Sequence, residues 1–192
     1  NIPEDPGVVA RVKELAGPIK EAMSKVVAET AAPVDGGRVT CRSGECAMGD
    51  LVADAMVERT AKQGVTIAIT NGGGLRASID AGPVTAGDIV AVLPFQNTLS
   101  TFQLADDDIV AALENGVSQV SDGAGRFPQV AGLHFSFDRK VAPNSGLIKS
   151  VEVKAGDGWQ PIEPDKLYLV ASNNYMRAGG GGYAGLRDKA RN

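Results

Sequence analysis

The sequence predicts a single domain of the α/β or α+β class, a mixed sheet with flanking helices, from three observations. The chain has 192 residues, enough for one sizeable domain, and 43% of them are hydrophobic, which is ordinary for a globular core. Helical and strand patterns are mixed along it, without an internal repeat, a long linker or a low-complexity tract. The β-branched run VTIAIT, residues 65–70, indicates a buried strand.

Apolar residues at helical spacing predict two helices in the first third of the chain. Residues 6–28 begin with Pro6, which suits a first helical turn, whereas Gly17 and Pro18 are expected to kink or interrupt this helix. Its end, Ser24–Thr30, has a second interpretation as a short strand. Residues 47–62 form an amphipathic helix whose predicted inward face consists of Met48, Leu51, Val52, Ala55, Met56 and Arg59.

Two more helices and four more strands are predicted after residue 80. Thr85 is expected to cap a short helix, TAGDIVAVL. The acidic run Asp106–Asp108 indicates the start of a helix that reaches about Val120. Its predicted inward residues are Ile109, Leu113 and Val117. The strands are predicted at residues 98–104, 133–138, 148–154 and 168–172, with GDGW as a hairpin-type turn.

Charge and apolar pattern argue against several classes of partner. The net charge of −4 is unfavourable for a general nucleic-acid or anionic-membrane binder, although a local basic pocket is compatible with it. No apolar run approaches the roughly 20 residues that span a bilayer. The opening NIPEDPGVV resembles the interior of a protein, so we expect an excised domain or a mature form cut from a precursor.

The counts of histidine and cysteine restrict the chemistry of this chain. A zinc or di-metal hydrolase site usually draws several ligands from these residues, but His134 is the only histidine and there are two cysteines. His134 lies in an alternating strand pattern without a nucleophile motif nearby, so we do not expect it to be catalytic. We therefore expect no metal site of His and Cys here, although this count leaves a magnesium site of carboxylates open. A complete small hydrolase that works through carboxylates such as Asp106–Asp108 is the least favoured alternative, because these residues suit a helix N-terminus.

The stretch NGGGLR, residues 71–76, has two interpretations. Asn-Gly is a strong turn signal, so the motif can be a tight turn and nothing more. Alternatively, successive backbone N–H groups can hold phosphate oxygens, and Arg76 would add a bidentate guanidinium. It matches neither the dinucleotide GxGxxG pattern nor the P-loop, which needs a lysine and a hydroxyl.

The stretch CRSGEC, residues 41–46, also has alternatives. Its closely spaced cysteines suit a small disulfide loop in an oxidising compartment, and such a loop would hold Arg42 for an anion contact. Two reduced thiols or half of a metal site are the other interpretations, with Arg42 on the solvated surface. Phe95 and Tyr175 can be core residues, or rings that stack on a flat ligand.

Five motifs in order resemble the C-terminal domain of the 5′-nucleotidase family. They are CRSGECAMGDLVADAM, NGGGLR with IDAGPVTAGDI, LPFQNTL, RFPQVAGLHFSFD and NNYMRAGGGGY, and together the resemblance covers about residues 5–190. Members are exported two-domain enzymes whose N-terminal metallophosphoesterase domain holds two metal ions. Their C-terminal domain binds the substrate and rotates to deliver its phosphate to those metals.

The resemblance implies specific roles in this sequence. Arg42 and Arg76 would hold the phosphate, and Asn71 would contact the base or nearby polar atoms. Phe95 and Tyr175 would sandwich the base, with Tyr175 replacing the phenylalanine common at that place. The glycines at 72–74, Gly73 among them, would let the backbone close on the ligand. No residue of this chain would be catalytic.

One departure from the family pattern concerns the ribose. The family's GGDG carries an aspartate that binds ribose hydroxyls, and Gly181 stands in its place here. Without that carboxylate, ribose recognition needs another group, or the substrate is not an ordinary ribonucleotide. The family also includes UDP-sugar hydrolases, cyclic-nucleotide phosphodiesterases, NAD-cleaving enzymes and hydrolases of sulfur oxidation.

Two functional hypotheses result from the sequence. In the first, residues 1–192 are the nucleotide-binding domain of a periplasmic or extracellular, metal-dependent 5′-nucleotidase-like phosphohydrolase. Its partners would be a phosphorylated small molecule and the N-terminal catalytic domain of the same precursor, which would hold both divalent metals. In the second, the chain is a non-catalytic module, or one re-specialised for another anionic ligand.

Overall fold

A four-stranded mixed sheet forms the centre of the structure, a computed structural model that describes residues 3–143 and 145–191. Its strand order is β4-β9-β2-β5, with β2 and β9 parallel and the other neighbours antiparallel. The fold class is therefore the expected one. The strands span Ile67–Asn71 (β2), Leu99–Ala105 (β4), Pro128–Ala131 (β5) and Leu167–Asn173 (β9).

Two helices cover opposite faces of this sheet, because alternate residues of a strand point to opposite sides. Ile67 and Ile69 of β2 belong to the same apolar cluster as residues of α5, Asp106–Val117. Ala68, between them, belongs to the cluster of α3, Ala47–Thr60. The sheet residues facing α3 include small alanines from three strands, which let this helix approach closely: Ala68, Ala131 and Ala171.

The predicted inward faces of these helices have different outcomes. In α5, all three predicted residues are fully buried, so that expectation is confirmed. In α3, the predicted face is partly wrong: Leu51 is 52% exposed and Ala55 and Arg59 are also exposed. The buried residues are instead Met48, Gly49, Ala53, Met56 and Thr60. The small residues Gly49 and Ala53 face the sheet, and small side chains give a weak periodic signal.

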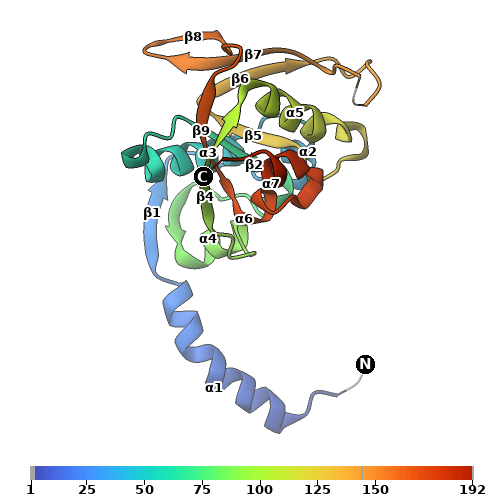
Figure 1. The fold of residues 1–192 in the computed structure, drawn as a ribbon. Coiled ribbons are helices and arrows are strands. Elements are labelled where there is room, and N and C mark those ends of the chain that lie inside the picture. The colour runs from blue at the N-terminus through green and yellow to red at the C-terminus, as the bar shows by residue number, and fades with distance from the viewer. Residues whose placement is uncertain (1–2, 144, 192) are drawn as a thin grey trace.

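A second, three-stranded sheet packs over α5, at the top of Figure 1. It consists of β6, Leu133–Phe137, β7, Ile148–Ala155, and β8, Gly158–Pro161, all antiparallel. The β7–β8 hairpin turns where GDGW predicts it, with Gly156 at φ 59°. Val151 and Val153 of β7 join the core around α5, which fixes this sheet to the centre.

The N-terminal helix α1, Pro6–Met23, projects away from the rest of the chain (Figure 1) and has no buried residue. It begins at Pro6 as expected, with Asp5 accepting hydrogen bonds from Gly7 and Val8. The expectation of an interruption at Pro18 is wrong, because α1 continues through it. Since the helix is exposed, water can bond the carbonyl that Pro18 leaves without a donor.

After α1, the strand interpretation of residues 24–30 is confirmed. β1, Val26–Thr30, pairs antiparallel with β3, Gly82–Thr85, which leads directly into α4, Ala86–Val92. The sequence patterns did not predict β3, β5 or the shorter helical segments. These segments are α2 Arg38–Ser43, η1 Ala61–Gln63, η2 Gly72–Gly74, η3 Val120–Asp122, α6 Asn174–Arg177, η4 Gly180–Gly182 and α7 Ala184–Asp188.

The cap of α4 predicts a pH-dependent stability. Asp88 accepts hydrogen bonds from the Thr85 hydroxyl (2.7 Å) and the Thr85 backbone N–H (2.8 Å), and these bonds lower the pKa of Asp88. A folded pKa below the unfolded one stabilises the protein above about pH 4, and this stabilisation is lost as pH falls through the folded pKa. We expect Asp88→Asn to lower Tm at pH 7, with the difference from wild type shrinking in acid.

Asp157→Asn, which changes an exposed carboxylate of the β7–β8 turn, is the matched control and should leave Tm unchanged. Thermal unfolding followed by circular dichroism between pH 7 and pH 3 makes the measurement. A Tm difference between wild type and Asp88→Asn that stays constant over this range would contradict the capping role.

Candidate functional site

Five of the six predicted binding residues line one cavity of about 630 Å³: Arg42, Asn71, Gly73, Phe95 and Tyr175. The topology explains why residues so distant in sequence meet. β2 and β9 are parallel neighbours, so their carboxyl ends, Asn71 and Asn173, lie at the same edge of the sheet. The loops that follow carry NGGG and NNYM, and this edge is where open α/β sheets bind ligands.

A disulfide between Cys41 and Cys46 closes the loop that contains Arg42, with the two Cα atoms 5.1 Å apart. The disulfide interpretation of CRSGEC is thus confirmed. Gln129 of β5 binds the same loop. Its amide nitrogen donates to the carbonyls of Cys41 (3.0 Å) and Gly44 (2.8 Å). Its amide oxygen accepts from the Cys46 N–H (3.2 Å), so a fully buried side chain satisfies three backbone groups.

Arg42 is a partly buried cation without a compensating anion. Its Nε is buried and has no hydrogen-bond partner, and Nη1 reaches only the Gly123 carbonyl at 3.5 Å. Burial lowers the pKa of Arg42 first, and the nearby positive charges of Arg38 and Arg76 lower it further. Among the described residues, no carboxylate forms an ion pair with Arg42. Bound phosphate would satisfy Nε and relieve this repulsion.

Arg76 lies beside the cavity rather than in its lining. Its side chain is exposed, and its guanidinium carbon is 5.8 Å from the centre of the Phe95 ring. Its backbone N–H donates to the Val92 carbonyl (3.0 Å), which fixes it against the end of α4. Arg76 therefore contributes positive charge near Arg42 and contacts one of the two rings of the cavity.

Phe95 and Tyr175 are not core residues. Phe95 is 56% exposed and Tyr175 is 48% exposed, yet both border the same cavity. The glycine-rich segment after Tyr175 makes room for its ring: a Cβ at Gly180 would lie 2.4 Å from Tyr175 Cε2. Two half-exposed rings on one cavity are an arrangement that suits stacking on a planar ligand.

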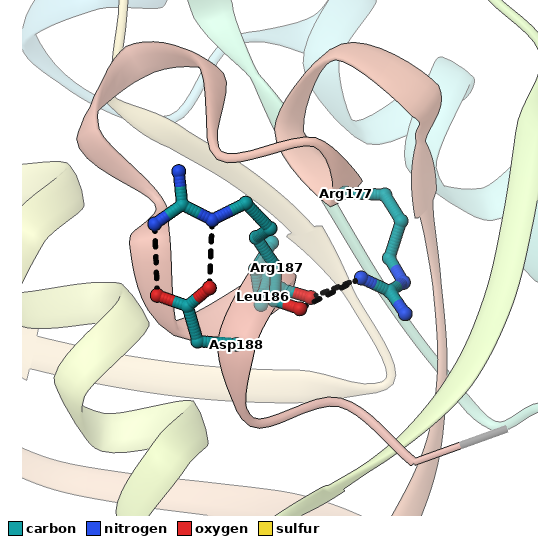
Figure 2. Close-up of polar contacts among 4 residues, drawn as sticks. All are labelled: Arg177, Leu186, Arg187 and Asp188. Carbon is teal, nitrogen blue, oxygen red and sulfur yellow. Dashed lines mark hydrogen bonds and ion pairs between the residues drawn. The ribbon is translucent and has the colours of Figure 1, made fainter.

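Hydrogen bonds join the short helices α6 and α7, which flank the glycine segment (Figure 2). Arg177, at the end of α6, donates from Nη1 to the carbonyls of Leu186 (2.8 Å) and Arg187 (3.2 Å) in α7. Arg187 in turn forms a two-bond pair with Asp188, at 2.7 and 2.9 Å. The helices at the two ends of the glycine segment are therefore joined by these hydrogen bonds.

The glycines of NGGGLR take part in the protein's own packing, and their predicted contact with phosphate stays a prediction. The N–H groups of Gly72 and Gly73 donate to the carbonyls of Phe127 and Gly125, both at 2.8 Å. A Cβ at Gly72 would lie 1.8 Å from the Cys41 carbonyl oxygen, and one at Gly73 would lie 2.7 Å from Gly125 Cα. The glycines let the disulfide loop and the 123–125 loop approach β2.

Asn71 is likewise bonded to the protein. Its Nδ2 donates to the Gly125 carbonyl (3.2 Å), and its Oδ1 accepts from Asn173 Nδ2 (3.0 Å). It lines the cavity but is 7% exposed. In the ligand-free protein it positions the 123–125 loop, and its predicted contact with a base stays a prediction.

Sequence reasoning missed three polar residues of the cavity: Asn97, Gln119 and Arg126. Arg126 stands in GAGRF, so glycines precede it as they precede Arg76 in NGGGLR. That shared pattern, and the position of Arg126 at the start of the motif RFPQVAGLHFSFD, were the signals available for it. Asn97 stands in the motif LPFQNTL, which was the signal available for it, whereas Gln119, directly before η3, lies in none of the five motifs.

A second cavity, of about 610 Å³, has the opposite electrostatic character. Its lining includes Glu45, Asp50 and Asp54, and burial together with the other two carboxylates raises the pKa of Asp50. His134 borders this cavity and stacks on Trp159, with ring centres 3.4 Å apart. A phosphate would be repelled from here, which leaves the arginine-lined cavity as the candidate anion site.

The described residues contain no group of three or more His, Cys, Asp or Glu side chains that could hold a metal ion. The arginine-lined cavity itself presents guanidinium and amide groups, which do not suit a divalent cation. Within the part of the chain that the structure covers, no helix is both long and apolar enough to cross a membrane.

The packing role of Gly72 predicts that Gly72→Ala destabilises the ligand-free chain by about 2 kcal/mol or more, since its Cβ would meet backbone. Gly185→Ala is the control, because nothing lies within 4 Å of its added Cβ; it should stay within about 0.5 kcal/mol of wild type. Urea unfolding measures both. A Gly72→Ala protein as stable as wild type but unable to bind phosphate would contradict the packing role and favour the phosphate-clearance interpretation.

Comparisons with known proteins identify the family of this chain. The family model described as "5'-nucleotidase, C-terminal domain" matches residues 26–188. A trifunctional nucleotide phosphoesterase, YfkN, of Bacillus subtilis is 37% identical over 94% of this chain and 12% of its own length. The human 5′-nucleotidase is 30% identical over 98% of this chain and 35% of its own length.

Solved structures of nucleotidases also match this chain over part of their own length. The 5′-nucleotidase precursor from Thermus thermophilus has 41% identity and a TM-score of 0.90, covering 97% of this chain and 36% of that one. Haemophilus influenzae NAD nucleotidase has 27% identity and a TM-score of 0.74, covering 96% and 34%. This chain thus spans well under half of these relatives. It belongs to the 5′-nucleotidase C-terminal domain family.

Proposed function

We propose that residues 1–192 are the substrate-binding domain of an exported, metal-dependent 5′-nucleotidase-like phosphohydrolase. One observation carries this proposal: Arg42, whose buried Nε has no hydrogen-bond partner among the described residues, lines a cavity that two half-exposed rings border. A nucleotide combines the two groups that such a site suits, an anion and a flat base. The phosphate binds Arg42 and Arg76, and the base stacks on Phe95 and Tyr175.

In this proposal the chain binds and orients, and it carries out no bond cleavage. Two divalent metal ions in an N-terminal catalytic domain of the same precursor would activate the attacking water. Relatives that extend far beyond the matched region support such a domain. The contribution of this chain is to hold the phosphate by guanidinium groups and the base by stacking, so that the phosphorus has a fixed position.

Helix α1 supports the presence of that second domain. Its apolar side chains Val8, Val12, Leu15 and Ile19 recur at helical spacing, and all are exposed. The matched family region begins at residue 26, so α1 lies outside it. An unpaired apolar stripe costs hydration free energy unless another surface covers it. We assign the catalytic domain of the precursor as that surface.

The disulfide supports an exported location. Small disulfide loops persist in oxidising compartments, and the Cys41–Cys46 bridge closes the loop of Arg42. We therefore place the protein in the periplasm or outside the cell, where the binding loop keeps its bridge. The re-specialised module stays the second candidate, because Gly181 stands where a ribose-binding carboxylate is expected and the cavity lining contains no carboxylate among the described residues.

The arginine roles predict a selective loss of affinity for phosphate-containing ligands. We expect Arg42→Gln to weaken 5′-AMP binding by about 10- to 100-fold and adenosine binding by less than about threefold, since charge-assisted bonds contribute about 1.5–3 kcal/mol. Arg76→Gln should act in the same direction, but less strongly because Arg76 is exposed. Calorimetric titration measures both ligands.

Two controls make this test decisive. Arg59→Gln removes an exposed charge on α3 outside the cavity and should leave both affinities unchanged. Wild-type chain incubated with 5′-AMP and Mn²⁺ or Zn²⁺ should release no phosphate. Equal losses for 5′-AMP and adenosine would refute the arginine roles, and metal-dependent hydrolysis by this chain would refute the division of labour.

The role of α1 predicts separable effects on folding and on assembly. We expect the double variant Val12→Gln and Leu15→Gln to keep the unfolding free energy of this chain within about 0.5 kcal/mol, because both residues are exposed. The same variant in the full precursor should raise hydrogen exchange along α1. Unchanged protection of α1 in the precursor would show that the stripe is not covered by the catalytic domain.

A further inference from the structure

We propose that Arg126 forms a second anion subsite of the same cavity, so that it selects ribonucleotides with phosphates on both sides of the ribose, of the nucleoside 3′,5′-bisphosphate class. This inference rests on the proposed function, because it takes the nucleotide cavity as given. Its own evidence is the position, charge and rigidity of Arg126.

Arg126 lines the cavity on a different wall from Arg42. Gly125 lies beside Arg42: a Cβ on it would be 3.5 Å from the Arg42 guanidinium carbon. The Arg126 side chain instead runs along the glycine segment of η4, since a Cβ at Gly182 would lie 3.3 Å from Arg126 Nη1. The two guanidiniums therefore have different neighbours, although both arginines line the cavity.

The charge of Arg126 is held in place by neutral groups alone. Its Nη1 donates to Asn115 Oδ1 (3.2 Å) and Ser118 Oγ (3.4 Å), and no carboxylate forms an ion pair with it among the described residues. These are the only hydrogen bonds of its guanidinium in that part of the chain. Its other donors therefore remain for a ligand.

The surroundings of Arg126 are rigid. The buried Tyr183 hydroxyl donates to the Arg126 carbonyl (2.6 Å), and Asn115 Nδ2 donates to the Gly181 carbonyl (3.2 Å). Asn115 therefore connects the Arg126 side chain to the glycine segment. Gly181 and Gly182 have φ values of 68° and 83°, which favour glycine, so this wall has no side chain between Arg126 and the cavity.

The chemistry of this wall disfavours an unmodified ribose. A ribose hydroxyl gains most from an acceptor such as a carboxylate, and the cavity lining contains none in the described chain. A guanidinium has donors alone, and its preferred partner is an anion that accepts two bonds. With the 5′-phosphate at Arg42 and the base between the rings, the sugar lies between the two arginines. A phosphate on its 3′ oxygen then meets Arg126.

The test compares three ligands by calorimetry at fixed ionic strength: 5′-AMP, adenosine 3′,5′-bisphosphate and ADP. ADP adds negative charge on the 5′ side and thus controls for general attraction. We expect wild type to bind the bisphosphate at least about tenfold more tightly than 5′-AMP. Arg126→Gln should abolish this preference while changing the affinities for 5′-AMP and ADP by less than about threefold.

A pair of variants at Gly181 provides an independent readout if Arg126→Gln is unstable. Gly181→Asp places a carboxylate beside Arg126, and Gly181→Asn places a neutral group of the same shape; both residues tolerate positive φ, and the added Cβ has 3.5 Å of clearance. We expect Gly181→Asp to lose the bisphosphate preference and Gly181→Asn to keep it.

The outcomes separate this inference from the proposed function. A wild-type chain that binds 5′-AMP in an Arg42-dependent way but shows no bisphosphate preference overturns the Arg126 subsite alone. An equal loss for ADP and the bisphosphate in Arg126→Gln also overturns it, because the effect is then general electrostatics. A chain that binds none of the three ligands overturns the proposed function itself.

Discussion

The three hydrogen bonds of the buried Gln129 amide to the disulfide loop are the constraint on which the site depends. They join the end of the central sheet to the loop of Arg42, and the disulfide removes the remaining freedom of that loop. The glycines that follow β2 let the loop approach so closely. A long cationic side chain is thereby held in a partly buried position that it would leave if the loop were free.

The surroundings of Arg42 lower its pKa. Burial, an unpartnered Nε and two neighbouring cations all disfavour the charged Arg42 guanidinium. A bound phosphate would bury Arg42 further, but its negative charge and its acceptor oxygens would offset the burial, the unpartnered Nε and the repulsion between the cations. Donors that are already fixed in position lose little conformational entropy when an anion binds. Because these donors are charged, such a site favours phosphate over neutral ligands. Arg126 is a second fixed cation of the cavity, because Asn115 and Ser118 hold its guanidinium through neutral acceptors.

Sequence patterns predicted the parts of this structure that depend on local chemistry. Pro6, the Thr85 cap and the run VTIAIT each mark an element that the structure contains, and the spacing of Cys41 and Cys46 suggested their disulfide. The missed features depend on tertiary contacts. Nothing local distinguishes a glycine that approaches a ligand from Gly72, which approaches the Cys41 carbonyl. Likewise, Ala53 of α3 is buried because the helix packs against the sheet at three alanines, Ala68, Ala131 and Ala171.

A crystal structure of this chain with 5′-AMP tests the central claim most directly. The account predicts phosphate oxygens within hydrogen-bond distance of Arg42, including its presently unpartnered Nε, and the adenine ring stacked on Phe95 and Tyr175. The N–H groups of Gly72 and Gly73 should keep their bonds to Phe127 and Gly125. Nucleotide bound elsewhere, or a phosphate held by the glycine N–H groups with Arg42 turned away, would contradict it.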